Sequence, residues 1–427
     1  MSTFLRYAKE AIHDMCYIWW MEMKNVVKDD GVLIFFVLVP LAYPLAYSWI
    51  YNNEVVHDVP VAVVDMSHSE LSRQFIRMMD ASSDVHTAYY CNSLAEAESL
   101  VGHQVVKGVV YLPSDFDKKI QRGEQAHVSV YCDMALMLTY KALFSTATNV
   151  SLAMNRQIQV SKLGSATQRD EEINTTPMVI EEVPIFNPTG GYGSAVLPGV
   201  LVLILQQTLL LGIGLSAGTA RENNRYKDLV PVSRHYNGIF RIVTGKALCY
   251  LMIYTVMAAY DTLVIPKLFG FTQLVRGSDL IGLMLPYLLS CIFFGMMLSC
   301  LVRYRENVML LVVFTSVPML FLSGISWPQS SIPGFWQGVS WLIPSTFGIR
   351  GFLRISSMGG TLHDIHTEYT VLWIQSIVYF FATCLVYRYQ VIKSRRHVNE
   401  RLEMMRQKVR KYIVHSSSSD YGESQSR

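Results

Sequence analysis

The side chains that could do chemistry in this sequence do not assemble into a catalytic motif. Gly245 and Lys246 come closest to a phosphate-binding loop. However, Ala247 stands where such a loop needs Ser or Thr, and the preceding glycine, Gly238, is too far away. The sequence also has no Gly-x-Ser-x-Gly element and no convincing Ser, His and Asp set for hydrolysis. We therefore expect no enzymatic activity and no bound cofactor in this chain.

Histidine and carboxylate residues gather before the last apolar segment, at His363, Asp364, His366 and Glu368. Histidines three residues apart share one face of a helix, which invites a metal site. Nothing at motif spacing supplies a third and a fourth strong ligand. The pattern favours a solvated helix at the membrane edge, and we predict no metal site.

Three polar residues interrupt apolar segments and are our candidates for a polar pathway: Gln206, Gln207 and Asp261. Polar groups within a membrane are costly unless they face protein or water. The two glutamines are expected to hydrogen-bond between helices. Asp261 is expected to line an exit or to balance Lys267, and a single acid without a second ionisable partner argues against proton coupling.

The composition shows what must position these residues. Of 427 residues, 51% are hydrophobic and only 16% are charged, which indicates a membrane protein. Six apolar segments are long enough to span a bilayer. They are residues 31–50, 195–217, 247–265, 280–302, 308–327 and 370–387. The first lacks a small-residue cleavage site, so we expect it to remain as an anchor. The predicted fold class is an α-helical polytopic membrane protein.

Charged segments between the spans predict the orientation. Residues 1–30 form an amphipathic, Trp-containing stretch typical of a helix at the inner interface. Basic residues dominate the segment 218–246, the turn at Arg303 and Arg305, and the tail 388–427. Six spans place all of them on one side, so both termini should be cytoplasmic. Beside a membrane, a basic tail indicates contact with anionic lipid and no nucleic-acid partner.

Residues 51–194 alternate short apolar runs with amphipathic stretches, which predicts an α/β domain with a parallel or mixed sheet. The six-span topology places this domain outside the cytoplasm. It contains two cysteines, Cys91 and Cys132, for which free thiols are favoured over a disulfide.

Residues 328–355 follow the fifth span and are unsuited to a simple span. The part 331–349 has no charge but contains several prolines and glycines. Irregular backbone at membrane depth requires protein or water around it. We predict a re-entrant segment at the outer mouth of a pathway. Its candidate gate residues, with the glycine that precedes it, are Gly324, Pro328, Pro333, Trp336, Pro344 and Arg350.

The order of motifs in this region closely resembles the membrane subunit of type-2 ABC transporters, the ABC exporter permeases. The motifs are Leu322-Ser323-Gly324, Trp327-Pro328, Ile332-Pro333, Trp336, Pro344 and Arg350-Gly351. Residues 293–311 resemble the fourth span, inner turn and fifth span of that family. Residues 221–246 resemble its inner loop. The large domain after the first span is shared with one branch of the family.

The resemblance implies a permease subunit of an ATP-driven exporter in the bacterial inner membrane. Two copies would form the pathway along spans one, two and five and the re-entrant segment, and ATP with Mg would bind to separate ATPase subunits. Coupling to the ATPase would use Arg221, Glu222, Tyr226, Leu229 and Val230. A periplasmic membrane-fusion adaptor is a further implied partner, and the transported substrate is left open.

Two other functions compete with this one. The chain could be a membrane-anchored receptor or attachment protein that presents its α/β domain, which predicts no ATPase partner. It could also be a secondary transporter, but internal repeats and intramembrane acids for ion coupling are lacking in the sequence.

Overall fold

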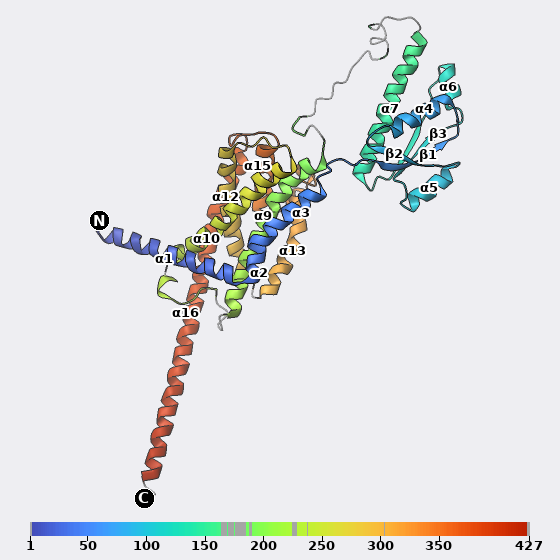
Figure 1. Ribbon diagram of the computed structural model, residues 1–427. Coiled ribbons are helices and arrows are strands. Elements are labelled where there is room, and N and C mark those ends of the chain that lie inside the picture. Colours follow the sequence, from blue (N-terminus) through green and yellow to red (C-terminus); the bar gives the residue numbers. More distant parts are fainter. Residues whose placement is uncertain are drawn as a thin grey trace. The chain divides into compact units, whose positions relative to one another are not determined.

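The computed structural model describes residues 2–163, 169, 175, 185–187, 190–223, 229–236, 238–302 and 304–424. The chain divides into two compact units, both drawn in Figure 1. The helix unit comprises Met1–Asn52 and Phe186–Arg427, and the sheet unit is Asn53–Ile185.

Six helical segments among the described residues are long and apolar enough to cross a membrane, in agreement with the predicted number. They are Asp30–Ile50, Tyr192–Asn223, Ile239–Phe269, Gly277–Ser299, Arg305–Leu322 and His366–Gln407. Helices dominate the chain as a whole. It is a polytopic helical membrane protein.

The first three spans are built as follows. Helix α1 (Ser2–Lys28) precedes a first span made of α2 (Asp30–Leu33), the π-helical turn η1 (Ile34–Leu38) and α3 (Val39–Ile50). The second span is α9 (Tyr192–Asn223). The third is α10 (Ile239–Ala259), the π-helical turn η3 (Tyr260–Val264) and α11 (Ile265–Phe269), and η2 (Arg234–Tyr236) precedes it.

The remaining spans are α12 (Gly277–Ser299), α13 (Arg305–Leu322) and the long helix α16 (His366–Ser424). Between the last two lie η4 (Gln329–Ser331), α14 (Gly334–Ser340) and α15 (Pro344–Ser356). With 59 residues, α16 is about 90 Å long, so it extends well beyond a bilayer.

Both π-helical turns lie just before a proline, Pro40 after η1 and Pro266 after η3. Proline has no N–H and its ring crowds the carbonyl four residues earlier, so a widened turn relieves the clash. For Pro266 that carbonyl belongs to Thr262. The side chain of Gln273 donates a hydrogen bond to it at 2.6 Å, which satisfies the freed acceptor inside an apolar helix.

The helix unit has two ends with different contents. At one end, which we call the loop end, one cavity is lined by residues of α1, α9, α10, α13 and α16 and by residues 229–236. The opposite end, which we call the hairpin end, contains the residues around Leu274 and Ser356. There Leu274 N donates a hydrogen bond to Ser356 O at 2.8 Å. Tyr51 O and Phe271 lie against Gly193 at this end. The chain thus leaves the helix unit near Asn52 and re-enters it at the hairpin end.

Helix α9 is central in the helix unit and packs against α12, α13, α15 and α3. Its small residues permit this packing. A Cβ at Gly214 would come within 2.4 Å of Val308, and one at Gly218 within 3.0 Å of the backbone of Arg305. The small-residue face of α9 therefore lies against α13 of the same chain.

The sheet unit contains four strands in the order β2-β1-β3-β4. They are β1 (Val59–Asp65), β2 (Val85–Tyr90), β3 (Gly108–Leu112) and β4 (Ser129–Cys132). Strand β1 is parallel to β2 and β3, with Val61 opposite Gly108, and β4 is antiparallel to β3. The helices are α4 (Glu70–Asp80), α5 (Leu94–Gly102), α6 (Phe116–Arg122) and α7 (Met137–Leu163).

Alternate residues of β1 face two different cores. Val61 and Val63 pack with α4, α6 and α7, whereas Ala62 and Val64 pack with α5. This period of two is why the sequence of the first strand reads as one continuous apolar run.

Cys91 and Cys132 are both free, and the fold keeps them apart. Cys91 follows β2 and Cys132 ends β4, so they lie at opposite edges of the four-stranded sheet. They also belong to the cores on opposite faces. Three strand spacings amount to about 14 Å, twice the largest Cα separation that a disulfide bridges.

Several predicted boundaries differ from the structure, among them the following three. Helix α9 continues to Asn223 and α10 begins at Ile239, so both ends of the predicted loop 218–246 are helical. Helix α13 ends at Leu322, before the predicted end of the fifth span at residue 327. Gly324 has φ of 89°, a left-handed conformation that terminates helices and that hydropathy does not detect.

Candidate functional site

A cavity of about 990 Å³ opens at the loop end of the helix unit. Charged side chains of both signs line it, together with part of the segment 229–236. Its charged lining residues are Glu22, Lys28, Asp29, Asp30, Lys246 and Arg305. The site is built from these residues and from the segment beside them.

The most buried ion pair of the site joins α1 to α10. Lys246 Nζ lies 3.1 Å from Glu22 Oε2, and both side chains are less than a tenth exposed. Ser216 donates to Glu22 at 3.3 Å, and the Tyr250 hydroxyl donates to it as well. A Cβ at Gly245 would come within 3.0 Å of the backbone of Met15, so this glycine lets α1 cross α10 closely. The Gly-Lys pair is therefore a helix-packing element in this chain.

A second network surrounds Asp29 at the start of the first span. One carboxylate oxygen caps α2 and accepts from Arg305 Nη2 at 2.8 Å, and the other accepts from Thr219 at 2.6 Å. Partial burial raises the pKa of Asp29. The hydrogen bonds from Thr219 and Val32, with the charge of Arg305, lower that pKa more, so it lies below its ordinary value. The first, second and fifth spans are joined here.

The segment 229–236 has a buried base and an exposed tip. Leu229 and Val230 are 1% and 2% exposed and belong to the core of the helix unit. Ser394 of α16 donates to Val230 O at 2.9 Å. Residues 231–234 are exposed, and Val232 is 52% exposed. This corrects the prediction that Leu229 and Val230 present an apolar face to a partner: their surfaces are already used within the chain.

The remaining predicted coupling residues are held by the turn after α12. Arg221 is buried and donates to Cys300 O at 3.0 Å. Glu222 accepts from the backbone N–H of Arg305 at 3.1 Å. Both belong to the last turn of α9. Tyr226 lies outside the described residues.

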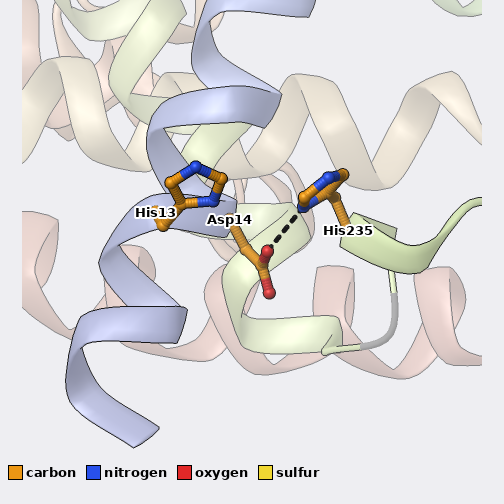
Figure 2. Close-up of side chains that lie close together, drawn as sticks. All are labelled: His13, Asp14 and His235. Carbon is orange, nitrogen blue, oxygen red and sulfur yellow. Dashed lines mark hydrogen bonds and ion pairs between the residues drawn. The ribbon is translucent and has the colours of Figure 1, made fainter. Parts of the chain in front are cut away.

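A cluster of polar residues ties the segment 229–236 to α1 from its other side. Asp14 accepts from Arg241 Nη1 at 2.7 Å and lies 2.8 Å from His235 Nδ1, as Figure 2 shows for the histidine. Partial burial raises the pKa of Asp14. The hydrogen bonds and charges of His235 and Arg241 lower it more, so the pKa is below its ordinary value.

The predicted re-entrant segment consists mainly of two short helices. Helix α15 is largely buried, with Pro344 at its start, and packs against α9, α12 and α16. Helix α14 is exposed, with Trp336 half exposed. Pro328 and Pro333 directly precede η4 and α14. An entirely apolar hollow of about 320 Å³ is lined by Pro318, Phe321, Leu322, Trp327, Ile332, Pro333 and Trp336.

Arg350 of α15 lies 3.8 Å from Glu368 of α16, and Arg354 lies 3.1 Å from it. Glu368 is buried, so its charge is balanced by two arginines. Asp364 accepts from the N–H and hydroxyl of Thr361 at 2.8 Å. The acids of the cluster at 363–368 thus have separate structural partners, whereas the prediction placed the whole cluster on a solvated helix.

The three predicted pathway residues are buried or nearly so. Gln206 is fully buried and contacts α12 and α13, with Cys291 Sγ at 3.5 Å and Met319 Sδ at 3.4 Å. Gln207 donates to the same sulfur at 3.2 Å. The glutamines therefore connect helices, as predicted. Asp261 is buried in η3 with no hydrogen-bond partner for either oxygen among the described residues, and Lys267 is exposed, so the expected balance between them is not formed.

Sequence reasoning missed the acids that hold the loop end together: Asp14, Glu22 and Asp29. One signal was present. Ile18, Glu22 and Val26 recur every fourth residue, which places Glu22 in the middle of the buried face of α1. An acid in the apolar stripe of a helix indicates a buried cationic partner. The identity of that partner, Lys246, depends on how the helices pack.

Six apolar helical segments among the described residues define the class as a polytopic membrane protein. A family model described as "ABC-2 family transporter protein" matches residues 31–385. This covers far more than half of the chain, and the chain belongs to that family. It is thus a multi-pass ABC-2 type permease, a transport subunit that is not itself catalytic.

Two relatives carry names that agree with this family. A "probable multidrug ABC transporter permease", YbhR of Escherichia coli strain K12, is 20% identical over 348 residues, which is 78% of this chain and 86% of the relative. A "linearmycin resistance permease protein", LnrN of Bacillus subtilis strain 168, is 22% identical over 351 residues, which is 77% of this chain and 88% of the relative.

Among solved structures, a crystal structure of a domain of a putative ABC type-2 transporter from Thermotoga maritima MSB8 matches 28% of this chain and 81% of that chain. Its identity is 17% and its TM-score is 0.21. A similarity at that level carries no argument here.

Proposed function

We propose that this chain is the membrane subunit of an ATP-driven exporter in a bacterial inner membrane. Two copies form the pathway, and separate ATPase subunits bind ATP and Mg and dock at the loop end. The loop end then faces the cytoplasm, and the sheet unit, whose connections leave the hairpin end, lies outside the cytoplasm. The names of the relatives favour antibiotics and other drugs as substrates.

The observation that carries this proposal is the construction of the segment 229–236. An exposed tip stands on a buried base, and the base is fixed to α16 through Ser394. A partner that moves the tip must also move the helices to which the base is attached. Protein interiors are close-packed and transmit displacement well.

Two further contacts extend the path of that movement. His235 connects the segment to Asp14 of α1, and Arg241 connects Asp14 to α10. From α1, the Glu22 to Lys246 pair leads to α10, and the Asp29 to Arg305 pair leads to α13. Binding of two ATPases in two alternative arrangements would shift the permease between its states, because each arrangement contacts the tips differently.

The proposed contact surface is the exposed tip, residues 231–234. The test is co-purification of the full chain with its co-expressed ATPase in detergent. V232D puts a charge in place of an exposed apolar side chain of the tip and should reduce the bound ATPase at least tenfold. Because Val232 is exposed, the unfolding midpoint of the variant should stay unchanged.

The matched control is V105D, which charges another exposed valine, in the sheet unit. It should leave the ATPase bound. A V232D chain that retains its ATPase and its transport activity would refute the docking surface. If V105D alone released the ATPase, the docking surface would have to be moved to the sheet unit.

The sheet unit is proposed to contact a periplasmic membrane-fusion adaptor or to shape the exit of the substrate. Its place in the chain, between the first and the second span, supports this role. Deletion of the sheet unit from the full exporter should abolish adaptor capture and leave ATPase binding intact.

A further inference from the structure

Three side chains that could ligate a metal lie close together at the loop end, away from the histidine and carboxylate cluster at 363–368. His13 and Asp14 belong to α1, and His235 belongs to η2. One ligand atom from each lies within 4.8 Å of the other two, and no other group of this kind occurs among the residues that the structure describes. Figure 2 shows the two imidazole rings on either side of the Asp14 carboxylate.

We propose that His13, Asp14 and His235 bind one divalent transition-metal ion, with Zn²⁺ preferred, and that this ion fastens the segment 229–236 to α1. Two imidazoles and one carboxylate are a ligand set that suits zinc, with water in the fourth position. Imidazole ligands also disfavour Mg²⁺ and Ca²⁺, which take oxygen ligands.

The geometry needs only small movements. Two ligands bonded to zinc at 2.0 to 2.1 Å with a tetrahedral angle lie about 3.3 Å apart. Asp14 Oδ1 and His235 Nδ1, now 2.8 Å apart, must separate by about half an ångström. His13 must approach, and its exposed side chain is free to change rotamer.

The surroundings already orient two of the three ligands. Arg241 holds the Oδ2 atom of Asp14 at 2.7 Å, which leaves Oδ1 directed at His235. The ring of Tyr17 lies against the His235 ring, with centroids 4.3 Å apart. Partners of this kind fix the orientation of a ligand before the metal arrives. The third ligand, His13, is accessible from solvent, so an ion can enter.

The proposal does not depend on the proposed function, because metal binding is measured on the chain itself. The full chain is purified in detergent with a tag that contains no histidine run, stripped with a chelator and titrated with Zn²⁺. We expect one Zn²⁺ per chain, with binding that millimolar Mg²⁺ does not displace. H13A and H235A should each weaken the affinity at least tenfold.

H13A is the decisive variant, because the ring of His13 is exposed and makes no ion pair among the described contacts. The variant should fold normally and keep the bonds of Asp14 to His235 and Arg241. The matched control is the double variant H363A/H366A, which removes the other pair of neighbouring histidines and should leave the affinity unchanged.

Hydrogen exchange provides a second measurement. Zn²⁺ should slow exchange around His13 and Asp14 in the middle of α1 and in residues 229–241 of the wild-type chain, and should have no such effect on H13A. Unchanged zinc affinity in H13A, displacement by Mg²⁺, or loss of the ion in H363A/H366A would each overturn the proposal.

Discussion

At the scale of residues, nearby side chains of the segment 229–236 have different structural roles, because some are buried and others are exposed. Leu229 is 1% exposed and Val232 is 52% exposed, although only three positions separate them. Hydropathy treats both as apolar residues of one loop. Leu229 is buried and therefore stabilises the helix unit. Val232 is exposed and belongs to the surface on which a partner is proposed to dock.

This difference predicts separate effects for two similar truncations. L229A removes a buried leucine side chain and should cost about 2–5 kcal/mol, depending on how far the cavity collapses. V232A should change stability by less than about 0.5 kcal/mol. Thermal unfolding of the purified chain in detergent measures both. Equal unfolding midpoints for the two variants would contradict the assignment of Leu229 to the base.

Asp29 predicts a dependence of stability on pH. Its pKa in the folded chain lies below the ordinary value of about 3.9, so its stabilising effect is complete above that value. The effect is lost as the pH falls through the lower, folded pKa. D29N keeps a capping side chain and loses the charge.

The unfolding midpoint of the wild-type chain should therefore exceed that of D29N at pH 6, and the gap should shrink below about pH 4. The comparison with D29N cancels the titration of the other carboxylates to a first approximation. A gap of the same size at pH 6 and pH 3 would show that the charge of Asp29 does not matter.

At the scale of elements, α15 shows how the predicted re-entrant segment is held. The side of α15 that carries Gly348 faces α12. A Cβ at Gly348 would come within 2.3 Å of the Tyr287 ring of α12. The ring cannot turn away freely, because the Tyr287 hydroxyl donates to Val202 O at 2.7 Å. The helix therefore depends on the absence of a side chain at this position.

We expect G348A to destabilise the chain by about 1–3 kcal/mol through overpacking between α15 and α12. The control is G338A in α14, where an added Cβ meets no atom within 4 Å. Ala is favoured over Gly in a helix, so the control should be neutral or slightly stabilising. If G348A unfolds at the same temperature as G338A, the packing of α15 described above is incorrect.

The elements also show what local sequence predicts well. All six spans appear because an apolar run of sufficient length is a local signal. The π-helical turns precede Pro40 and Pro266, whereas Pro198, Pro286 and Pro318 lie in spans without such a turn, so proline alone does not predict one. The hydrogen bond from Gln273 that completes the second turn joins residues eleven positions apart. The early end of α13 at Leu322 depends on the left-handed backbone of Gly324, which hydropathy does not detect.

At the scale of the whole molecule, an even number of spans brings the first and the last helix to the same side of the bilayer. Helix α1 and the part of α16 around Ser394 both reach the loop end. Lys246 and Arg305, from the basic segments of the sequence, line the cavity at that end, which is the basis for proposing that this end faces the cytoplasm. The sheet unit is attached at the opposite end, through residues near Asn52 and Phe186.

This arrangement predicts which positions a membrane-impermeant maleimide reaches in intact cells. In a cysteine-free background, A95C on the exposed side of α5 should be labelled from outside the inner membrane. S233C, in the exposed tip, should be labelled only after the membrane is opened. Labelling of S233C in intact cells, with protection of A95C, would reverse the proposed orientation.

The sequence by itself determined the class of the protein, the number of its spans, the alternation of strands and helices in the sheet unit, and the role of Gln206 between helices. Each of these depends on periodicity, composition or length within a short window. The tertiary structure decided which charges meet. Asp29 and Arg305 are 276 positions apart, and Glu22 and Ser216 are 194 apart. Such pairs form only when helices pack in one particular register, because a side chain finds its partner through space and not along the chain. The same packing buries Leu229 and Val230 and places the ring of His13 close to that of His235.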